Sequence, residues 1–118
     1  MSDFPRRPSF VNEDVERRHD VRGPVKGLHC ALSGGVVVDV IEAGRRGVFV
    51  ALEDPDAYPL GVRMDVVLDI ARERAGGAAS AVTARVEVVR KEIDPRRGVA
   101  LMIVHMTPAA EAVYLGWL

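Results

Sequence analysis

The chain has 118 residues, with 16 Lys and Arg against 17 Asp and Glu and a formal net charge of −1. This length fits a single domain that buries its own core, and the balanced charge and the 5% aromatic content disfavour a DNA- or RNA-binding protein. Cys30 is the single cysteine, which excludes an internal disulfide; without an apolar leader or a run of ~18 apolar residues, we expect a cytoplasmic domain that does not insert into membranes.

Residues 1–15 combine Pro5, Pro8 and Ser9 with mixed charges and show no hydrophobic period. We expect them to form a flexible N-terminal arm, followed by one folded domain over residues 16–118. The domain opens with the stretch ERRHDVR (16–22), which sets three arginines just before a Gly-Pro pair. Because the residue before a proline is pushed toward extended geometry, this stretch is predicted to be a linker rather than a helix.

A period-two pattern of β-branched residues then predicts six short strands. They cover residues 25–32, 36–41, 48–52, 62–70, 82–90 and 99–106. The stretch EAGRRG (42–47) is predicted to be a hairpin turn, and residues 53–61, 71–80 and 91–98 are predicted loops or turns. The last strand is apolar on both faces, so it should be covered on both sides.

A helix is predicted at the end of the sequence, over residues 109–118. Thr107 fits its N-cap and Pro108 its first position. Its only charge is Glu111, which leaves two interpretations open. Either the helix is buried over an open end or flank of the sheet, or it offers Val113, Tyr114, Trp117 and Leu118 to a protein partner. The predicted fold is mainly β: a six-stranded antiparallel barrel with a C-terminal α-helix.

Signatures of catalysis are missing from the sequence. His29 and Cys30 are neighbours in a predicted strand, so they point to opposite faces and do not share a metal ion. No spaced set of Cys and His, phosphate-cradling glycine loop or nucleophile elbow occurs. We therefore expect no enzymatic activity, no metal site and no cofactor.

The arginines suggest a different chemistry. Arg17, Arg18 and Arg22 lie around a His-Asp pair in the predicted linker. A guanidinium group pairs bidentately with phosphate or with the N7/O6 edge of guanine, and its flat face stacks on a base. The linker therefore suits a planar anionic ligand.

Over residues 14–118 the chain resembles the PilZ domain, the bacterial receptor module for cyclic-di-GMP. The resemblance rests on four stretches: ERRHDVR, VIEAGRRGVFV (40–50), PLGVRMDVVLDI (59–70) and RRGVALMIV (96–104). It implies a PilZ-like barrel whose ligand is held by Arg17, Arg18 and Arg22 together with the hairpin residues Glu42, Gly44, Arg45 and Gly47.

The hairpin departs from the family pattern, which reads Asp/Asn-x-Ser-x-x-Gly. Aligned on Gly47, which the family uses for a tight turn, the chain has Glu42 for the short acid or amide and Gly44 for the serine. Two displaced or lost hydrogen bonds would weaken binding by about one to three orders of magnitude. Arg45 and Arg46 either compensate by pairing with phosphate or are ordinary solvated turn residues. A further alternative is that Glu42 pairs with Arg18 or Arg22 in the free protein.

Two functions follow from the resemblance. The first is a signalling receptor that binds cyclic-di-GMP and regulates a protein partner in bacterial motility, surface attachment or exopolysaccharide output. The second is a degenerate, PilZ-like protein–protein adaptor that no longer binds the nucleotide. Both require a protein partner, and the oligomeric state stays open, with a homodimer among the alternatives.

Overall fold

The computed structural model describes residues 23–77 and 79–118. The strands are β1 (Gly23–Pro24), β2 (Leu28–Ala31), β3 (Val37–Ala43), β4 (Gly47–Ala51), β5 (Arg63–Ile70), β6 (Ala81–Glu92) and β7 (Gly98–His105). The helices are a 3₁₀ turn, η1 (Pro55–Ala57), and the α-helices α2 (Arg72–Ala75) and α3 (Pro108–Trp117). The predicted domain boundary near residue 15 and the arginines of the linker lie outside the described residues.

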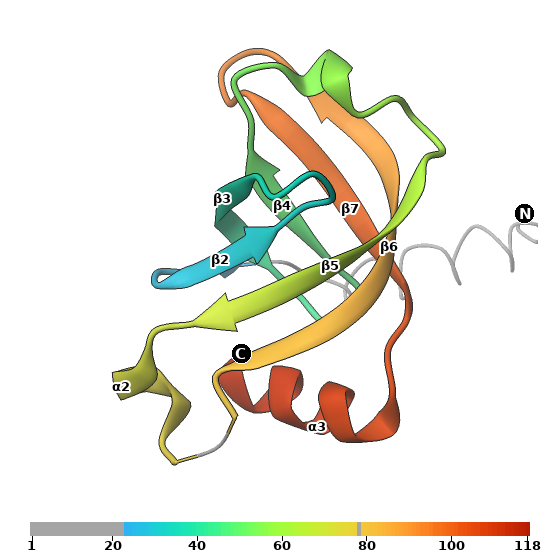
Figure 1. Cartoon of the computed structure of the whole chain (residues 1–118). Coiled ribbons are helices and arrows are strands. Elements are labelled where there is room, and N and C mark those ends of the chain that lie inside the picture. The colour runs from blue at the N-terminus through green and yellow to red at the C-terminus, as the bar shows by residue number, and fades with distance from the viewer. Residues whose placement is uncertain (1–22, 78) are drawn as a thin grey trace, which may run out of the picture.

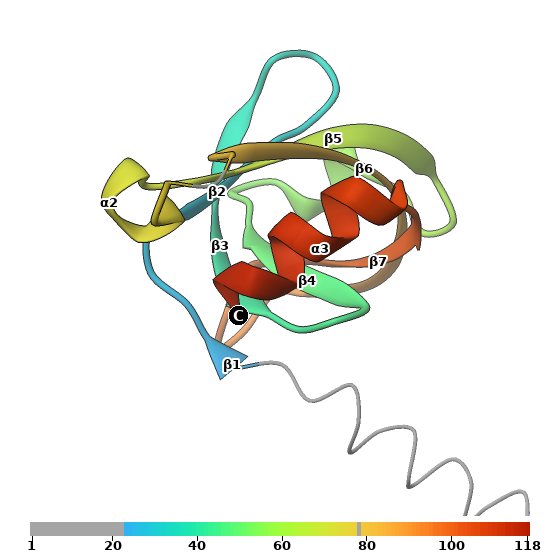
Figure 2. The ribbon, with the colours of Figure 1, turned by 90° about the horizontal axis from the view of Figure 1, so that it is seen from below.

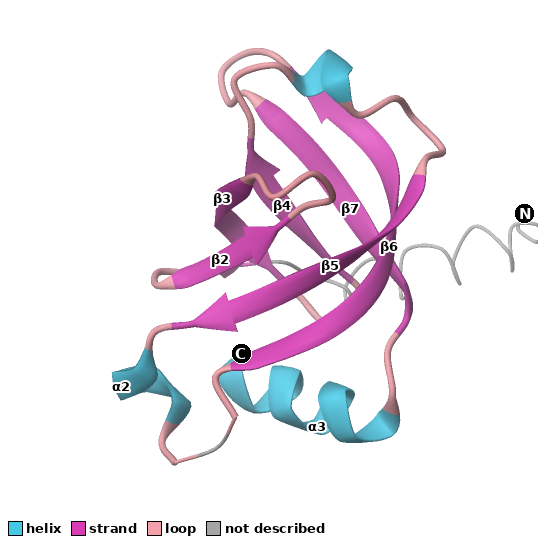
Figure 3. Cartoon of the chain, in the orientation of Figure 1, coloured by secondary structure: helices cyan, strands magenta, loops and turns pink. Residues whose placement is uncertain are grey.

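Six strands form a closed antiparallel barrel, which confirms the predicted fold class (Figure 1). The sheet runs β3-β2-β5-β6-β7-β4, and pairing of β4 with β3 closes it. The two-residue strand β1 is an addition, paired to the end of β3. Figure 3 shows how far strands dominate the described chain.

The barrel core follows the period-two pattern of the sequence. Along β5 every second residue is buried, and β6 repeats this alternation from Val82 to Val88. In β7 the predicted cover on both faces holds for Val99, Ala100 and Leu101, which are all fully buried, but Met102 is exposed on the outer face. The two-sided cover therefore reaches only half of the last strand.

Helix α3 lies across one open end of the barrel (Figure 2). The Thr107 hydroxyl accepts a hydrogen bond from the backbone N–H of Ala110 at 3.1 Å, so Thr107 is the predicted N-cap. Tyr114 and Trp117 are buried against the core and meet edge to face, with ring centroids 6.3 Å apart. For these two side chains the interpretation as core cover is confirmed.

The structure differs locally from the sequence prediction. The predicted turn 42–47 is shorter, because Glu42 and Ala43 belong to β3 and Gly47 begins β4. Of the predicted strand 25–32, only Leu28–Ala31 form a strand, because the chain turns at Gly27, whose φ is +78°. The predicted turn over 71–80 contains the short helix α2. Strand β6 continues to Glu92, because Lys91 and Glu92 still pair with Val99 and Gly98 of β7.

Candidate functional site

The hairpin between β3 and β4 is the centre of the predicted site. The N–H of Gly44 donates to the carbonyl of Gly47 at 2.9 Å, which closes the turn. The carbonyl of Gly44 in turn accepts a hydrogen bond from the Tyr114 hydroxyl. The hairpin that carries the predicted ligand residues is thus fastened to the helix that covers the barrel.

Strand β1 runs beside this hairpin. Gly23 pairs with Ala43 and Pro24 with Glu42, and the N–H of Val25 donates to the carbonyl of Ile41 at 3.2 Å. Arg17, Arg18 and Arg22 are outside the described residues, but Arg22 directly precedes Gly23 in the sequence. The first described residue, Gly23, therefore lies in the strand directly beside the hairpin.

Gly47 has a steric role in this hairpin. A Cβ atom added to Gly47 would lie 2.6 Å from the carbonyl oxygen of Leu101 in the neighbouring strand β7. Its φ is outside the left-handed region, so the backbone conformation alone would accept another residue. The close approach of β7, rather than the tight turn implied by the resemblance, is what requires glycine here.

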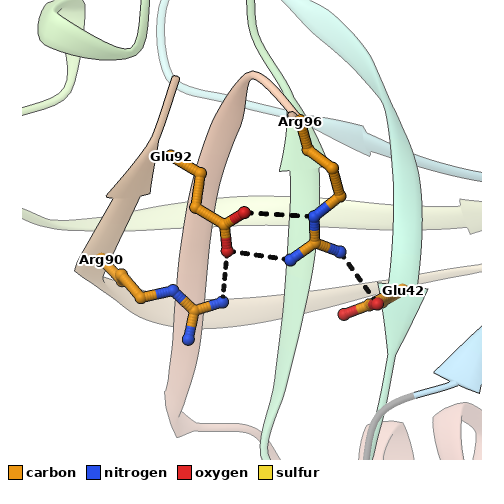
Figure 4. Close-up of polar contacts among 4 residues, drawn as sticks. All are labelled: Glu42, Arg90, Glu92 and Arg96. Atoms are coloured by element: carbon orange, nitrogen blue, oxygen red, sulfur yellow. Dashed lines mark hydrogen bonds and ion pairs between the residues drawn. The ribbon is translucent and has the colours of Figure 1, made fainter. Parts of the chain in front are cut away.

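The carboxylate of Glu42 belongs to an ion-pair network on the outer surface of the barrel (Figure 4). Arg96, in the turn between β6 and β7, contacts Glu42 Oε2 through Nη1 at 2.8 Å. Its Nε and Nη2 donate to Glu92 at 3.2 and 2.9 Å, and Arg90 donates to Glu92 at 2.8 Å. The hydrogen bond from Arg96 is the main cause that lowers the pKa of Glu92, and the bonds to Glu92 and then Glu42 raise the pKa of Arg96.

The same guanidinium group covers an aromatic ring. Arg96 Cζ lies 4.0 Å from the centroid of the Phe49 ring, and Phe49 is fully buried although its strand neighbours Val48 and Val50 point into the core. Sequence reasoning missed this contact. The available signal was the position of Phe49, because an aromatic residue on the outward face of an alternating strand needs a cover.

On the other side of the hairpin lies a cleft of ≈ 610 Å³. Its lining comes from β1 and the residues after it, the start of the hairpin, α2 and the end of α3: Gly23, Pro24, Val25, Lys26, Ala43, Gly44, Arg45, Arg74, Trp117 and Leu118. Of the predicted ligand residues, Gly44 and Arg45 line this cleft, whereas Glu42 and Gly47 do not. The structure thus brings only Gly44 and Arg45 to this cleft, while Glu42 joins the ion-pair network and Gly47 is buried against β7.

Arg74 joins the elements around the cleft. It donates to the carbonyl of Lys26 through Nη1 and to the carbonyl of Trp117 through Nη2, the latter at 3.2 Å. The indole Nε1 of Trp117 is buried and has no hydrogen-bond partner among the residues that the structure describes. Nothing in the sequence pattern pointed to Arg74 or Lys26, which are 48 residues apart.

The remaining predicted residues lie in the hairpin turn and on helix α3. Arg45 and Arg46 also line a smaller hollow of ≈ 290 Å³ against the end of β7 and Glu111. Among the residues proposed for a partner, Val113 is half-buried and Leu118 is exposed, while Tyr114 and Trp117 are in the core. A partner-binding role for this helix stays a prediction.

Two searches of the described residues bear on other functions. Within residues 23–77 and 79–118, no group of three or more His, Cys, Asp and Glu side chains could hold a metal ion. In the same part of the chain, every helix is too short or too polar to cross a membrane.

Comparisons with known proteins give a likeness in fold. No family model matches the chain, and no curated protein matches it significantly. The solved structure of the Bacillus subtilis inhibitor of motility (MotI/DgrA) is similar, with a TM-score of 0.69 and 15% identity over 86% of this chain and 48% of that one. The Legionella uncharacterized protein Lpg0364 gives a TM-score of 0.56 and 16% identity, covering 80% of this chain and 87% of that one. The chain spans about half of the MotI/DgrA structure, and the two likenesses support a PilZ-like barrel fold.

Proposed function

We propose that the chain is a non-enzymatic, PilZ-like regulator that binds cyclic-di-GMP and controls a protein partner in motility, surface attachment or exopolysaccharide output. The ligand is held by Arg17, Arg18 and Arg22 from one side and by the hairpin 42–47 from the other. The likeness in fold to an inhibitor of motility supports this class of function.

The observation that carries the proposal is the pairing of β1 with the hairpin. Gly23 is paired with Ala43, so the backbone that follows Arg22 is fixed beside the turn. Three arginines attached to this anchor need only span a few residues to meet a ligand at Gly44 and Arg45. Their planar guanidinium groups suit both the phosphates and the guanines of cyclic-di-GMP.

Isothermal calorimetry of the 118-residue chain with cyclic-di-GMP tests the proposal. We expect micromolar or tighter binding that is lost in Arg18→Ala and in Arg22→Ala. Arg72→Ala is a matched control, because Arg72 is an exposed arginine of α2 outside the cleft lining. Binding that survives both linker substitutions would contradict the proposed site.

The second candidate function is an adaptor that no longer binds the nucleotide. It is favoured by the contact between Glu42 and Arg96, because a carboxylate engaged by an arginine is less available to the N–H groups of guanine. In the double variant Glu42→Asp/Gly44→Ser, the shorter Asp side chain should no longer reach Arg96. The variant also has the serine hydroxyl of the family pattern at position 44.

Calorimetry on this double variant separates the two candidates. If the chain is an adaptor, we expect no heat of binding when cyclic-di-GMP is added to the unmodified chain, and measurable binding to the variant. If the variant also fails to bind cyclic-di-GMP, the hairpin is not a nucleotide site in this protein.

A further inference from the structure

The outer surface of the barrel, away from the hairpin and its cleft, carries a row of uncharged side chains. The row crosses β3, β2, β5 and β6 through the register partners Val37, Ala31, Val67 and Thr83. Val37 is 64% exposed and Val67 is 38% exposed. In Figure 1, β2 and β5 lie at the front of the barrel, and α3 covers the open end below them. The described residues therefore leave the two valines of this face uncovered.

A polar row lies beside the apolar row, two residues further along each strand. Its register partners are Asp39, His29, Asp69 and Ala81. His29 Nε2 lies 3.4 Å from Asp39 Oδ1, whereas Asp69 has no ion pair within residues 23–77 and 79–118. On the other side of the apolar row, Arg85 contacts Asp65 at 3.2 Å. An apolar centre between polar edges is the usual arrangement of a protein–protein interface.

A two-fold axis that runs parallel to the strands, between β2 and β5, makes the apolar row complementary to itself. In a two-fold dimer the same patch is used by both copies. This axis puts β2 of one copy opposite β5 of the second copy, and β3 opposite β6. Ala31 then faces Val67 of the second copy, and Val37 faces Thr83. Each larger side chain therefore meets a smaller one across the interface.

The polar row fits the same axis. His29 of one copy faces Asp69 of the second copy, so an imidazole meets a carboxylate that has no ion pair in the described chain, and Asp39 faces Ala81. A two-fold axis perpendicular to the strands, along the apolar row, would instead bring Asp69 opposite Asp65 of the second copy. Two carboxylates that face each other repel. The charges therefore favour the axis parallel to the strands.

From this arrangement we propose that two copies of the chain associate through the outer face of β3, β2, β5 and β6, with the apolar row at the centre of a symmetric dimer. This inference is independent of the proposed function, because it involves neither the hairpin 42–47 nor the arginines of the linker. Strands about 4.8 Å apart give the row a length of roughly 14 Å. A standard interface buries about 800 Å² of each partner. Because this row is short for such an area, we expect a dimer that dissociates on dilution.

Sedimentation velocity of the full chain over a range of concentrations tests the dimer. We expect the weight-average sedimentation coefficient to rise with concentration for the unmodified chain. It should stay at the monomer value for Val67→Lys, because the interface would bury an unpaired charge. Val89→Lys is the matched control, since Val89 is an exposed valine further along β6, 43% exposed, and should leave the dimer unchanged. Thermal unfolding of each variant checks that the barrel is intact.

Two further variants test the position of the two-fold axis. Because Ala31 is expected to face Val67 of the second copy, Ala31→Lys and Val67→Asp should each be monomeric alone. An equimolar mixture of the two should form the dimer again. In the mixed dimer the new lysine faces the new aspartate, and the symmetry-related contact keeps the original alanine and valine.

Three outcomes would overturn the inference. A chain that stays monomeric at the highest soluble concentration leaves this face to a different protein. A dimer that Val67→Lys does not weaken uses another surface. A dimer that Val67→Lys weakens but that the mixture of Ala31→Lys with Val67→Asp does not restore lacks the proposed two-fold pairing.

Discussion

Replacing Gly47 by alanine tests whether this glycine is needed for the packing of the barrel or for ligand binding. The added Cβ would lie 2.6 Å from the carbonyl oxygen of Leu101 and 3.5 Å from the Cα of Met102, both on the backbone of β7. Backbone atoms in a paired strand yield only if the ladder moves, because Gly47 and Met102 are register partners. The strain therefore acts on the folded state with no ligand present.

The expected magnitude follows from two opposing effects. Overpacking at a closely packed position costs about 1–3 kcal/mol. The lower chain entropy of alanine in the unfolded state returns about 0.4–1 kcal/mol. The net loss of roughly 1–2 kcal/mol should lower the midpoint of urea unfolding, followed by far-UV circular dichroism, by roughly 1 M.

Gly116 supplies the matched control, because it is an exposed residue of α3 and an added Cβ would meet nothing within 4 Å. Gly116→Ala should raise the unfolding free energy by about 0.5–1 kcal/mol, the helix preference of alanine over glycine. The same substitution is thus expected to act with opposite signs at the two sites. A Gly47→Ala variant as stable as the unmodified chain would refute the close-approach argument and return Gly47 to a purely ligand-related role.

Three further predictions concern the helix, the ion-pair network and the core. Tyr114→Phe removes the hydrogen bond to the Gly44 carbonyl and should lower the free energy of unfolding in urea by about 1 kcal/mol; an unchanged value would mean that this bond does not hold the hairpin. The pKa of Glu92 lies below its ordinary 4.5, so its stabilising effect is present above pH 4.5 and is lost as the pH falls through the folded-state pKa. Urea unfolding should accordingly show the stability gap between the chain and Glu92→Gln shrinking on acidification, and a constant gap would contradict the ion pair. Burial raises the pKa of Cys30 to about 12, so a thiol reagent at pH 8 should label it only after unfolding, and rapid labelling of the folded chain would contradict its buried position.

The strands and the helix were predictable because their signals are local. Alternating apolar residues mark β5 and β6, continuous apolar runs mark β4 and the first half of β7, and Thr107-Pro108 marks the start of α3. The break at Gly27 had a signal that the strand prediction did not use, since a glycine inside a strand pattern often marks a bend or a close approach. In the structure its carbonyl accepts the N–H of Ala71 at 2.9 Å, so the bend brings two distant segments together.

The partners of the hairpin were not predictable in the same way. Glu42 meets Arg96 only because Glu42 pairs with Phe49 across β3 and β4, and the turn after β6 brings Arg96 over that ring. Sequence reasoning considered only Arg18 and Arg22 as partners for Glu42, because they were the cations of the recognised motif. Strand register and barrel closure determine such contacts, and both depend on segments that are far apart in the sequence. A local sequence pattern therefore does not predict them.

The charges on the two sides of the hairpin bear on how a ligand would act. On the outer face Arg96 is balanced by Glu42 and Glu92, so an incoming anion gains little there before an ion pair opens. In the cleft, Lys26 and Arg45 have no ion pair among the described residues, so no ion pair of theirs within that part of the chain has to open first. The hydrogen bond between Tyr114 and Gly44 links the hairpin to α3, so a ligand that shifts the hairpin also acts on the helix. Because a ligand can shift a structure only by binding its two states unequally, an effect on α3 requires contacts on the hairpin as well as in the cleft.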